Sequence, residues 1–557
     1  MPTTSTLLSA GAFGIATHVF YFHGRERHLH PQRYLQVCFI LFFVSTTVIK
    51  YARYTATMAF AMQEMGKLLG SYIAGIYLSL VIFRLFLNPL NKFPGRPLSR
   101  LSALDHSFHI GKKRDMFLKL YQSHKELGKF VRTGPHDLSV THPDVVRVAL
   151  SAQAVCGKAP WYEVEAPAYS LQSTRVRSQH DKRRRVWSPA FSDKALRGYE
   201  LRVHRYNECL MLQIDSFSGQ PIDMSKWFNY WSFDVMGDLA FGRSFNMLES
   251  AGEHWAIKLL NTSQDDLGLA LPPWIGRLCW QIAPLRAVYD RFHKFCASEI
   301  EQRILLQGKQ PNPDITHYLI EDLIAKDAQG QKAALPLLHL DSKLIIVAGS
   351  DTTAATLTFL FYHLAIEPGL ISRLREEVET SVGDASKIEH QHLQSASLLN
   401  ACINETLRLH PPVPSGLYRK TPPEGVCIGD EWIPGNTTIQ IHLYSMARDE
   451  SNFAMAEQFI PERFYSQPKL VKNKDAFAPF SIGPYGCIGK NLAYMEIRLL
   501  TAHLITKFDV ALAPGENGTA LLNSVDHFTV GLKPINMIFT RRSRARDGDR
   551  NSRKVQM

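Results

Sequence analysis

The chain has 557 residues, of which 45% are hydrophobic and 20% are charged, and its formal net charge is +12. This size and apolar content allow a large core in a single α-rich unit. The eight cysteines are scattered without a C-x-x-C pair, which excludes a disulfide framework or zinc site and indicates a reducing compartment. No nucleic-acid motif is present, so the basic charge suits an anionic membrane surface or an acidic protein partner.

The N-terminal region contains three apolar stretches, at about residues 7–22, 34–49 and 68–87. The third is long enough to span a bilayer, whereas the first two could be spans, a re-entrant pair or an interfacial hairpin. We therefore predict a membrane-anchoring region over residues 1–92 with one to three transmembrane helices. Lys and Arg are more frequent on the side of these stretches that carries the rest of the chain, which places the large C-terminal part in the cytosol.

A proline-rich connector, residues 88–97, follows the third stretch and predicts a stiff, non-helical hinge. We assign residues 93–540 to one large domain. The basic tail, residues 541–557, is expected to be a solvated, disordered terminus.

The next segment of interest is strongly basic and runs from His180 to Ser192. It contains Lys182, Arg183 and Arg185, which we interpret as a surface patch for an acidic protein partner.

A long helix is predicted from Leu340 to Ile366, ending at Pro368. In its middle, Ala-Gly-Ser-Asp-Thr-Thr places Asp351 and Thr352 among small residues that leave room for a ligand. An acid followed by an alcohol can relay protons, but the hydroxyl could instead bond to the carbonyl one turn earlier.

Glu405 and Arg408 are three residues apart on the next predicted helix and so point the same way. Such a pair is usually a solvated surface bridge. After it come Arg419 and two segments with strand and turn patterns, residues 427–435 and 437–442, which predict a small β region.

Residues 480–489, Phe-Ser-Ile-Gly-Pro-Tyr-Gly-Cys-Ile-Gly, place Cys487 in a glycine-rich loop just before a predicted helix. The helix N-terminus stabilises a thiolate, and glycines let the backbone approach a flat cofactor closely. A buried structural cysteine is the alternative reading of this loop taken alone.

The loop resembles the heme-binding pattern F-x-x-G-x-R-x-C-x-G of the cytochrome P450 family, the heme-thiolate monooxygenases. Phe480, Gly483, Cys487 and Gly489 match this pattern. Tyr485 departs from it, because the family usually has Arg or His there to pair with a heme propionate. The resemblance covers about residues 93–539.

The resemblance implies roles for the other motifs. The long-helix segment matches [AG]-G-x-[DE]-T-[TS] throughout, which implies a proton relay through Asp351 and Thr352 to iron-bound dioxygen. The E-x-x-R motif is expected to be buried and structural, joined by Arg463 from the P-E-R-F loop. Cys487 would be the axial ligand of heme b.

The remaining implied heme contacts are to the propionates. Three side chains are expected there, with Tyr485 contributing at most a hydrogen bond: His180, Arg184 and Arg419. His180 stands where the family has the Trp of W-x-x-x-R, and Arg184 stands at the Arg.

The family resemblance implies a mainly α fold with a smaller β region and insertion of one atom of O2 into a lipophilic small molecule. The chain has no flavin or dinucleotide motif, so we expect NADPH electrons from a separate cytochrome P450 reductase, with cytochrome b5 as a further donor. The expected location is the endoplasmic reticulum membrane, with the catalytic domain facing the cytosol. The N-terminus and heme loop resemble fungal secondary-metabolite hydroxylases, including tryprostatin-hydroxylase-like enzymes.

Two alternatives remain from other classes. One is a reductase-independent heme-thiolate isomerase, dehydratase or ring-closing enzyme, and the other is a non-enzymatic heme sensor. Residues 155–171 and 268–282 are candidate substrate-lining segments, and the second could dip into the membrane or cap the core.

Overall fold

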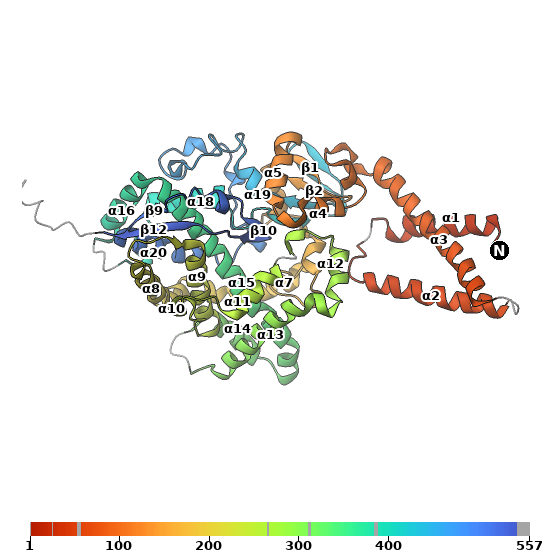
Figure 1. Cartoon of the computed structure of the whole chain (residues 1–557), viewed down its shortest axis with the longest axis horizontal. Helices are drawn as coiled ribbons and strands as arrows, with labels where there is room; N and C mark the ends of the chain where they lie inside the picture. The colour runs from red at the N-terminus through yellow and green to blue at the C-terminus, as the bar shows by residue number, and fades with distance from the viewer. Residues whose placement is uncertain are drawn as a thin grey trace, which may run out of the picture.

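The computed structural model of the chain describes residues 2–24, 26–52, 57–264, 267–309, 313–383 and 388–542. Figure 1 shows a mainly helical body with three N-terminal helices extending from one end. The predicted basic tail lies outside the described residues, except for Arg541 and Arg542.

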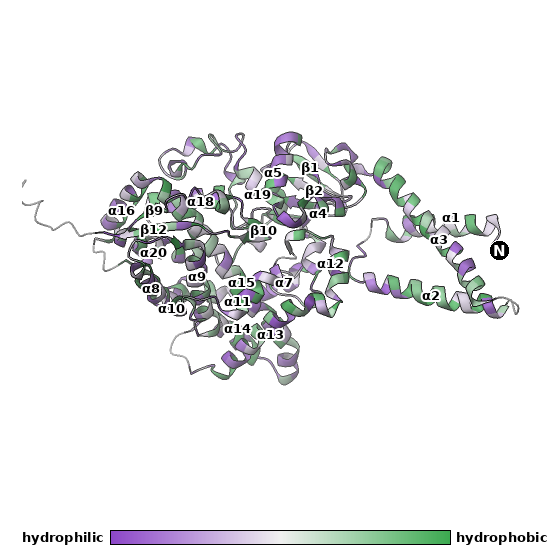
Figure 2. Cartoon of the chain, in the orientation of Figure 1, coloured by the Kyte–Doolittle hydropathy of each residue, from purple (hydrophilic) through white to green (hydrophobic). Residues whose placement is uncertain are grey.

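Three apolar helices form the N-terminal region: α1 (Thr4–Thr17), extended by the π-helical η1 (His18–Phe22), α2 (Pro31–Ala52), and α3 (Met58–Ile82), extended by η2 (Phe83–Leu87). Each is long and apolar enough to cross a membrane, judged by length and composition. Figure 2 shows hydrophobic residues along all three helices, away from the body of the molecule. This arrangement indicates a membrane anchor.

Helices α1 and α3 pack closely and run in the same direction. Near one end, Ser71 Oγ donates a hydrogen bond to the carbonyl of Leu7 over 2.6 Å, and near the other His18 Nδ1 lies 2.8 Å from Ser79 Oγ. A Cβ atom added at Gly75 would lie 2.0 Å from a backbone oxygen of α1. Small residues allow this close approach of membrane helices. The ends of α1 and α3 nearer the catalytic domain are therefore both C-terminal.

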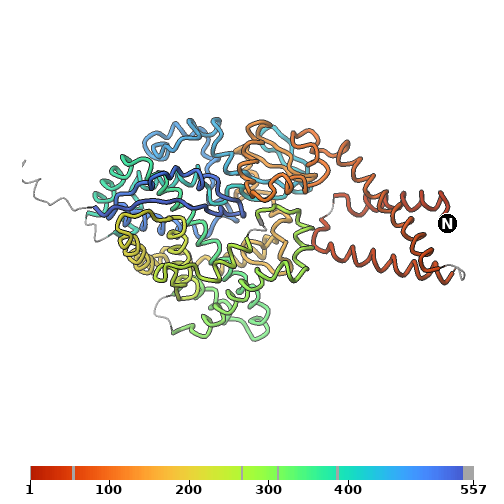
Figure 3. The backbone as a smooth tube through the Cα atoms, in the orientation of Figure 1, coloured from red at the N-terminus to blue at the C-terminus, as the bar shows by residue number. Residues whose placement is uncertain are grey.

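The catalytic body is built mainly from helices (Figure 3). The longer ones are α5 (Met116–Leu127), α7 (Arg177–Trp187), α8 (Asp193–Ser216), α9 (Met224–Phe241), α11 (Trp255–Gln264), α12 (Pro273–Trp280), α13 (Ala283–Leu305), α14 (Ile315–Ile324), α15 (Ala328–Ile366), α16 (Pro368–Val382), α18 (Ser397–Leu409) and α20 (Lys490–Lys507). The shorter ones are α4 (Leu104–Ile110), α6 (Asp144–Leu150), α10 (Met247–Ser250), α17 (His390–Leu393), α19 (Leu443–Ala447) and α21 (Thr519–Leu522).

Helix α15 crosses the centre of the body and begins earlier than the sequence predicted. Asp327 caps its start by accepting a hydrogen bond from the backbone N–H of Gly330, and Pro336 lies inside the helix without ending it. The helix is apolar enough to span a membrane but is largely buried within the protein. It packs on α9, where a Cβ atom at Gly349 would lie 2.6 Å from Met236 Cε.

The β structure is small, as predicted. A five-stranded sheet has the order β1-β2-β8-β5-β3, and only the β2–β8 pair is parallel. The other strands form three smaller sheets, β4-β12-β9, β6-β7 and β10-β11. The bounds of all the strands are β1 (Phe130–Arg132), β2 (Asp137–Val140), β3 (Gly157–Lys158), β4 (Ile222–Asp223), β5 (Leu417–Lys420), β6 (Val426–Ile428), β7 (Glu431–Ile433), β8 (Thr438–Ile441), β9 (Phe508–Leu512), β10 (Val525–His527), β11 (Thr529–Gly531) and β12 (Asn536–Arg541). The pairing of β3 with β5 sets Lys158 opposite Arg419.

Helix α12, within the candidate segment 268–282, packs against the membrane helix α2 (Figure 1). Arg277 donates hydrogen bonds to the carbonyls of Leu29 and Val164, over 3.2 and 2.9 Å, and so joins the anchor to the catalytic domain. Trp274 is 47% exposed on the same short helix. The segment therefore borders the N-terminal helices.

Candidate active site

The loop that carries Cys487 ends directly on the N-terminus of α20. Gly483 has a positive φ of 67°, and a Cβ atom there would lie 2.3 Å from the carbonyl oxygen of Leu150. The Cys487 N–H donates to the carbonyl of Phe480 over 2.8 Å, and the next helix begins at Lys490. The glycine is therefore required by close backbone contact, and the loop fixes Cys487 at a helix start.

Cys487 has exposed surface, yet burial raises the pKa of its thiol. Hydrogen bonds from the backbone of Gly489 and Lys490, together with the charge of Arg184, lower the pKa in part. A metal or other cation would lower it further, because the thiolate is the ligand form.

Helix α15 also exposes a short stripe in an otherwise buried stretch. Ala348 is exposed and Thr352 is half-buried, one turn apart. The Thr352 hydroxyl donates a hydrogen bond to the carbonyl of Ala348 over 2.8 Å. This is the bond to the carbonyl one turn earlier that the sequence left open as an alternative to a proton relay. Its oxygen can still accept a hydrogen bond while this bond persists.

Asp351 is buried and accepts a hydrogen bond from Gln264 Nε2 over 2.9 Å. Burial raises the pKa of Asp351 to about 6, although the Gln264 bond lowers it in part. No cation among the described residues pairs with this carboxyl. Asp351 therefore exchanges a proton close to neutral pH, which suits a proton donor.

Four of the predicted binding residues meet around the loop. Arg184 donates to the carbonyl of Gly486 over 2.6 Å. The buried His180 packs edge-on against the Tyr485 ring, with 4.5 Å between ring centroids. The guanidinium carbon of Arg419 lies 5.3 Å from the centroid of the same ring.

Lys158, which sequence reasoning missed, completes this group. Its Nζ lies 4.6 Å from the centre of the Tyr485 ring, and the side chain is 5% exposed. Burial, followed by repulsion from Arg419 and Arg184, lowers the pKa of Lys158 to about 7. A lone lysine in a two-residue strand carries no sequence signal, because its neighbours come from distant segments.

These residues fit an anionic cofactor. Among the described residues, no carboxylate forms a salt bridge with Lys158, Arg184 or Arg419. Lys158 Nζ donates to the backbone carbonyls of Leu171 and Gln172, which carry no net charge, and Arg419 Nε has no hydrogen-bond partner. Burying cations without counter-charges is costly, so the arrangement favours an anion bound beside Cys487. The two propionates of heme have that charge, and heme iron takes a thiolate ligand.

One assignment in the basic segment is wrong. Arg183 is not part of a surface patch, because its Nε donates to the buried Asp341 over 2.5 Å. Asp341 also accepts from the indole N–H of Trp187 over 3.1 Å. Arg183 therefore ties α7 to α15, while Lys182 and Arg185 remain exposed.

The E-x-x-R motif forms a buried network, not a surface bridge. Glu405 accepts from Arg408 over 2.7 and 2.8 Å and from Arg463 Nε over 2.9 Å, and all three side chains are fully buried. Arg408 also donates to the carbonyls of Ala447 and Ala456. The network ties α18 to the backbone at Ala447 and Ala456 and to Arg463 of the P-E-R-F loop, so its role is structural.

The chain belongs to the cytochrome P450 family. The family described as Cytochrome P450 matches residues 94–539. This confirms the resemblance drawn from the motifs and the expected fold class, and it implies heme, O2 and electrons supplied by a redox partner.

Its relatives are fungal enzymes of similar length. Cytochrome P450 monooxygenase lcsK of Purpureocillium lilacinum is 42% identical over 98% of this chain and 100% of its own. Tryprostatin B 6-hydroxylase of Aspergillus fumigatus is 39% identical over 96% of both chains. Cytochrome P450 monooxygenase notG' of Aspergillus versicolor is 38% identical over 96% of this chain and 98% of its own. The chain is therefore a P450 monooxygenase, as expected.

Proposed function

We propose that this enzyme hydroxylates a lipophilic small molecule in fungal secondary metabolism, using heme b and electrons from NADPH. The observation that carries the proposal is the geometry around Cys487: its exposed thiol stands just before the start of α20, next to Gly486, whose carbonyl accepts a hydrogen bond from Arg184. A purely structural cysteine is usually buried.

The chain's own residues would divide the work as follows. Cys487 would ligate the iron, and Lys158, Arg184 and Arg419 would balance the propionates. Heme b, when bound, supplies the iron chemistry that activates O2. Asp351 would hold a proton on its carboxyl, which it can do near neutral pH because burial raises its pKa to about 6.

Thr352 would receive that proton at its hydroxyl and pass it on from the exposed stripe of α15 that it shares with Ala348. This role needs the hydroxyl to leave the carbonyl of Ala348, or to accept while it donates there. The intact acid–alcohol pair favours oxygen activation over a reductase-independent isomerisation or dehydration.

Electrons would come from NADPH–cytochrome P450 reductase, with cytochrome b5 as a further donor. The exposed Lys182 and Arg185 on α7 offer positive charge for an acidic partner. We place the enzyme in the endoplasmic reticulum membrane with its catalytic domain in the cytosol. The parallel packing of α1 and α3 supports three spans and an N-terminus in the lumen.

The substrate proposal rests on the relatives and on the anchor. A relative named Tryprostatin B 6-hydroxylase supports hydroxylation of a ring carbon, and an indole, terpenoid or polyketide scaffold would suit such chemistry. Helix α12 lies beside α2, with Trp274 exposed, which favours a substrate that partitions into the membrane.

The proposal is tested in membranes that contain the full chain and a fungal reductase, supplied with NADPH and a panel of indole, terpenoid and polyketide compounds. We expect a product that carries one oxygen atom from labelled O2. Thr352→Ala should consume NADPH while forming peroxide in place of product. Thr356→Ala is the matched control, because Thr356 forms the same backbone bond one turn later but is buried. A product formed without NADPH or O2 would instead support the isomerase class.

A further inference from the structure

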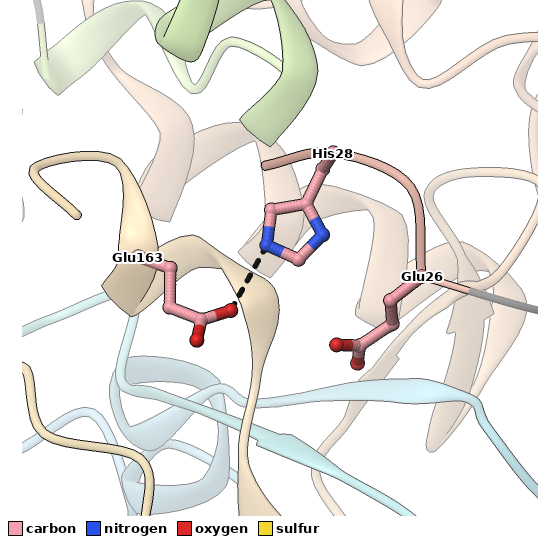
Figure 4. A group of neighbouring side chains, drawn as sticks. All are labelled: Glu26, His28 and Glu163. Atoms are coloured by element: carbon pink, nitrogen blue, oxygen red, sulfur yellow. Dashed lines mark hydrogen bonds and ion pairs between the residues drawn. The ribbon is translucent and has the colours of Figure 1, made fainter. Parts of the chain in front are cut away.

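The short connector between α1 and α2 is in direct contact with the catalytic domain. Glu26 accepts hydrogen bonds from Arg175 over 2.9 and 3.0 Å and from Lys420 Nζ over 2.6 Å. Next to it, His28 Nε2 lies 3.0 Å from a carboxylate oxygen of Glu163, as Figure 4 shows. A connector between two membrane helices would need none of these contacts for anchoring alone.

The three side chains in Figure 4 are close enough to hold a metal ion, but their charges are already balanced. Arg175 contacts both Glu26 and Glu163, and Lys420 contacts Glu26. A divalent cation would have to displace these cations or lie beside them, which Coulomb repulsion disfavours. The cluster is therefore an ion-pair network.

Glu26 stays ionised at any physiological pH. Burial raises its pKa, but hydrogen bonds from Arg175 and Lys420 outweigh that effect and lower the pKa to about 2. A carboxylate with a depressed pKa stabilises the folded state above its unfolded value and loses this effect only as the pH falls toward 2. The bridge is therefore constant across the range in which the enzyme works.

The two partners of Glu26 lie next to the residues that face Tyr485. Arg175 Nε donates to the carbonyl of Lys158 over 2.8 Å. Lys420 directly follows Arg419, and the β3–β5 pairing sets Lys158 opposite Arg419. Glu26 thus joins the two segments that carry the buried, uncompensated cations.

We propose that Glu26 of the α1–α2 connector is a positioning residue of the cofactor site: by bridging Arg175 and Lys420, it holds Lys158 and Arg419 in place for the heme propionates. This inference rests on the proposed heme-binding function. It gives the membrane hairpin a role in heme retention in addition to anchoring.

The test measures heme transfer from the full-length protein in detergent to excess apomyoglobin, followed by the shift of the Soret band. Glu26→Ala should speed heme loss by about tenfold, the effect of losing one set of charge-assisted hydrogen bonds. Glu26→Asp should restore much of the retention. The matched control is Glu431→Gln, which removes a 2.8 Å bridge between the exposed side chains of Glu431 and Lys92 and should leave the rate unchanged.

A double-variant cycle separates positioning from general loosening. In a Lys420→Ala background, Glu26→Ala should have a smaller effect than in the parent protein, because Glu26 no longer links the Arg419 segment and keeps only its bonds to Arg175. Equal heme loss in Glu26→Ala and the parent protein, or fully additive effects of the two changes, would overturn the inference. A parent protein that binds no heme through a thiolate would instead refute the proposed function. If Glu26→Ala does not fold, Lys420→Ala and Glu26→Gln give the same comparison.

Discussion

The protonation of Lys158 leads to a quantitative prediction, because the charge of this side chain depends on the charges of the groups around it. It is surrounded by Arg184, Arg419 and the rings of Tyr162 and Tyr485, with no carboxylate salt bridge among the described residues. Burial and the neighbouring cations lower its pKa to about 7. Anionic propionates would reverse that effect, so heme binding should be accompanied by proton uptake on Lys158.

The direction and size of this pH effect follow from the linkage between heme binding and protonation of Lys158. Heme binding is unaffected well below pH 7, where Lys158 is already charged, and weakens as the pH rises above 7, where a proton must be taken up. For a free-state pKa of about 7, the apparent affinity falls roughly tenfold between pH 6 and pH 8, or about 1.4 kcal/mol. Lys158→Arg keeps a permanent charge and should abolish this slope. Lys158→Met should bind heme more weakly at every pH, also without the slope.

The assay is the equilibrium partition of heme between the protein and apomyoglobin at pH 6, 7 and 8. The pH dependence of apomyoglobin itself cancels when the partition constant of each protein is divided by that of Lys158→Arg at the same pH. A parent protein with the same pH dependence as Lys158→Arg would refute the reasoning. It would show that Lys158 does not face the anionic edge of the cofactor.

Three further predictions concern the core, the relay and the anchor. Glu405→Gln should destabilise the fold by about 3–5 kcal/mol, because it leaves Arg408 and Arg463 buried without a counter-charge. Heme content and melting temperature should both fall, and a normal melting curve would contradict the structural role. Asp351→Asn should remove the change in product formation between pH 5 and pH 7, because it removes the group whose pKa is about 6, and a persistent profile would assign the titration to another group. A glycosylation sequon on an extension before residue 1 should be modified in microsomes, as expected for a luminal N-terminus, and an unmodified extension would argue against three spans.

Much of the site could be predicted because its chemistry depends on local order in the sequence. The loop around Cys487 needs glycine at positions such as Gly483, where the backbone leaves no room for a Cβ atom. The spacing of Glu405 and Arg408 fixes their mutual direction on a helix. Such constraints can be predicted from the sequence alone, because they do not depend on which distant segments contact one another in the fold.

The rest could not be predicted, because it depends on contacts between distant segments. Arg183 resembles its exposed neighbours in sequence, and only the packing of α7 on α15 gives it Asp341 as a partner. Lys158 gains its role from strand pairing with β5, and Gln264 from the approach of α11 to Asp351. Glu26 lies in what reads as a simple connector between membrane helices. Hydrophobic periodicity carries no information about such pairings.

The most direct test of the central claim is the difference spectrum of the reduced, carbon-monoxide-bound protein in membranes, recorded for the parent chain, Cys487→Ala and Cys427→Ala. Cys427 lies exposed on β6, in a two-stranded sheet with β7, and serves as the matched control. The account predicts a Soret band at the position typical of thiolate ligation in the parent and in Cys427→Ala, and its loss in Cys487→Ala. A folded, heme-loaded parent protein without that band, or a band that survives in Cys487→Ala, would contradict it.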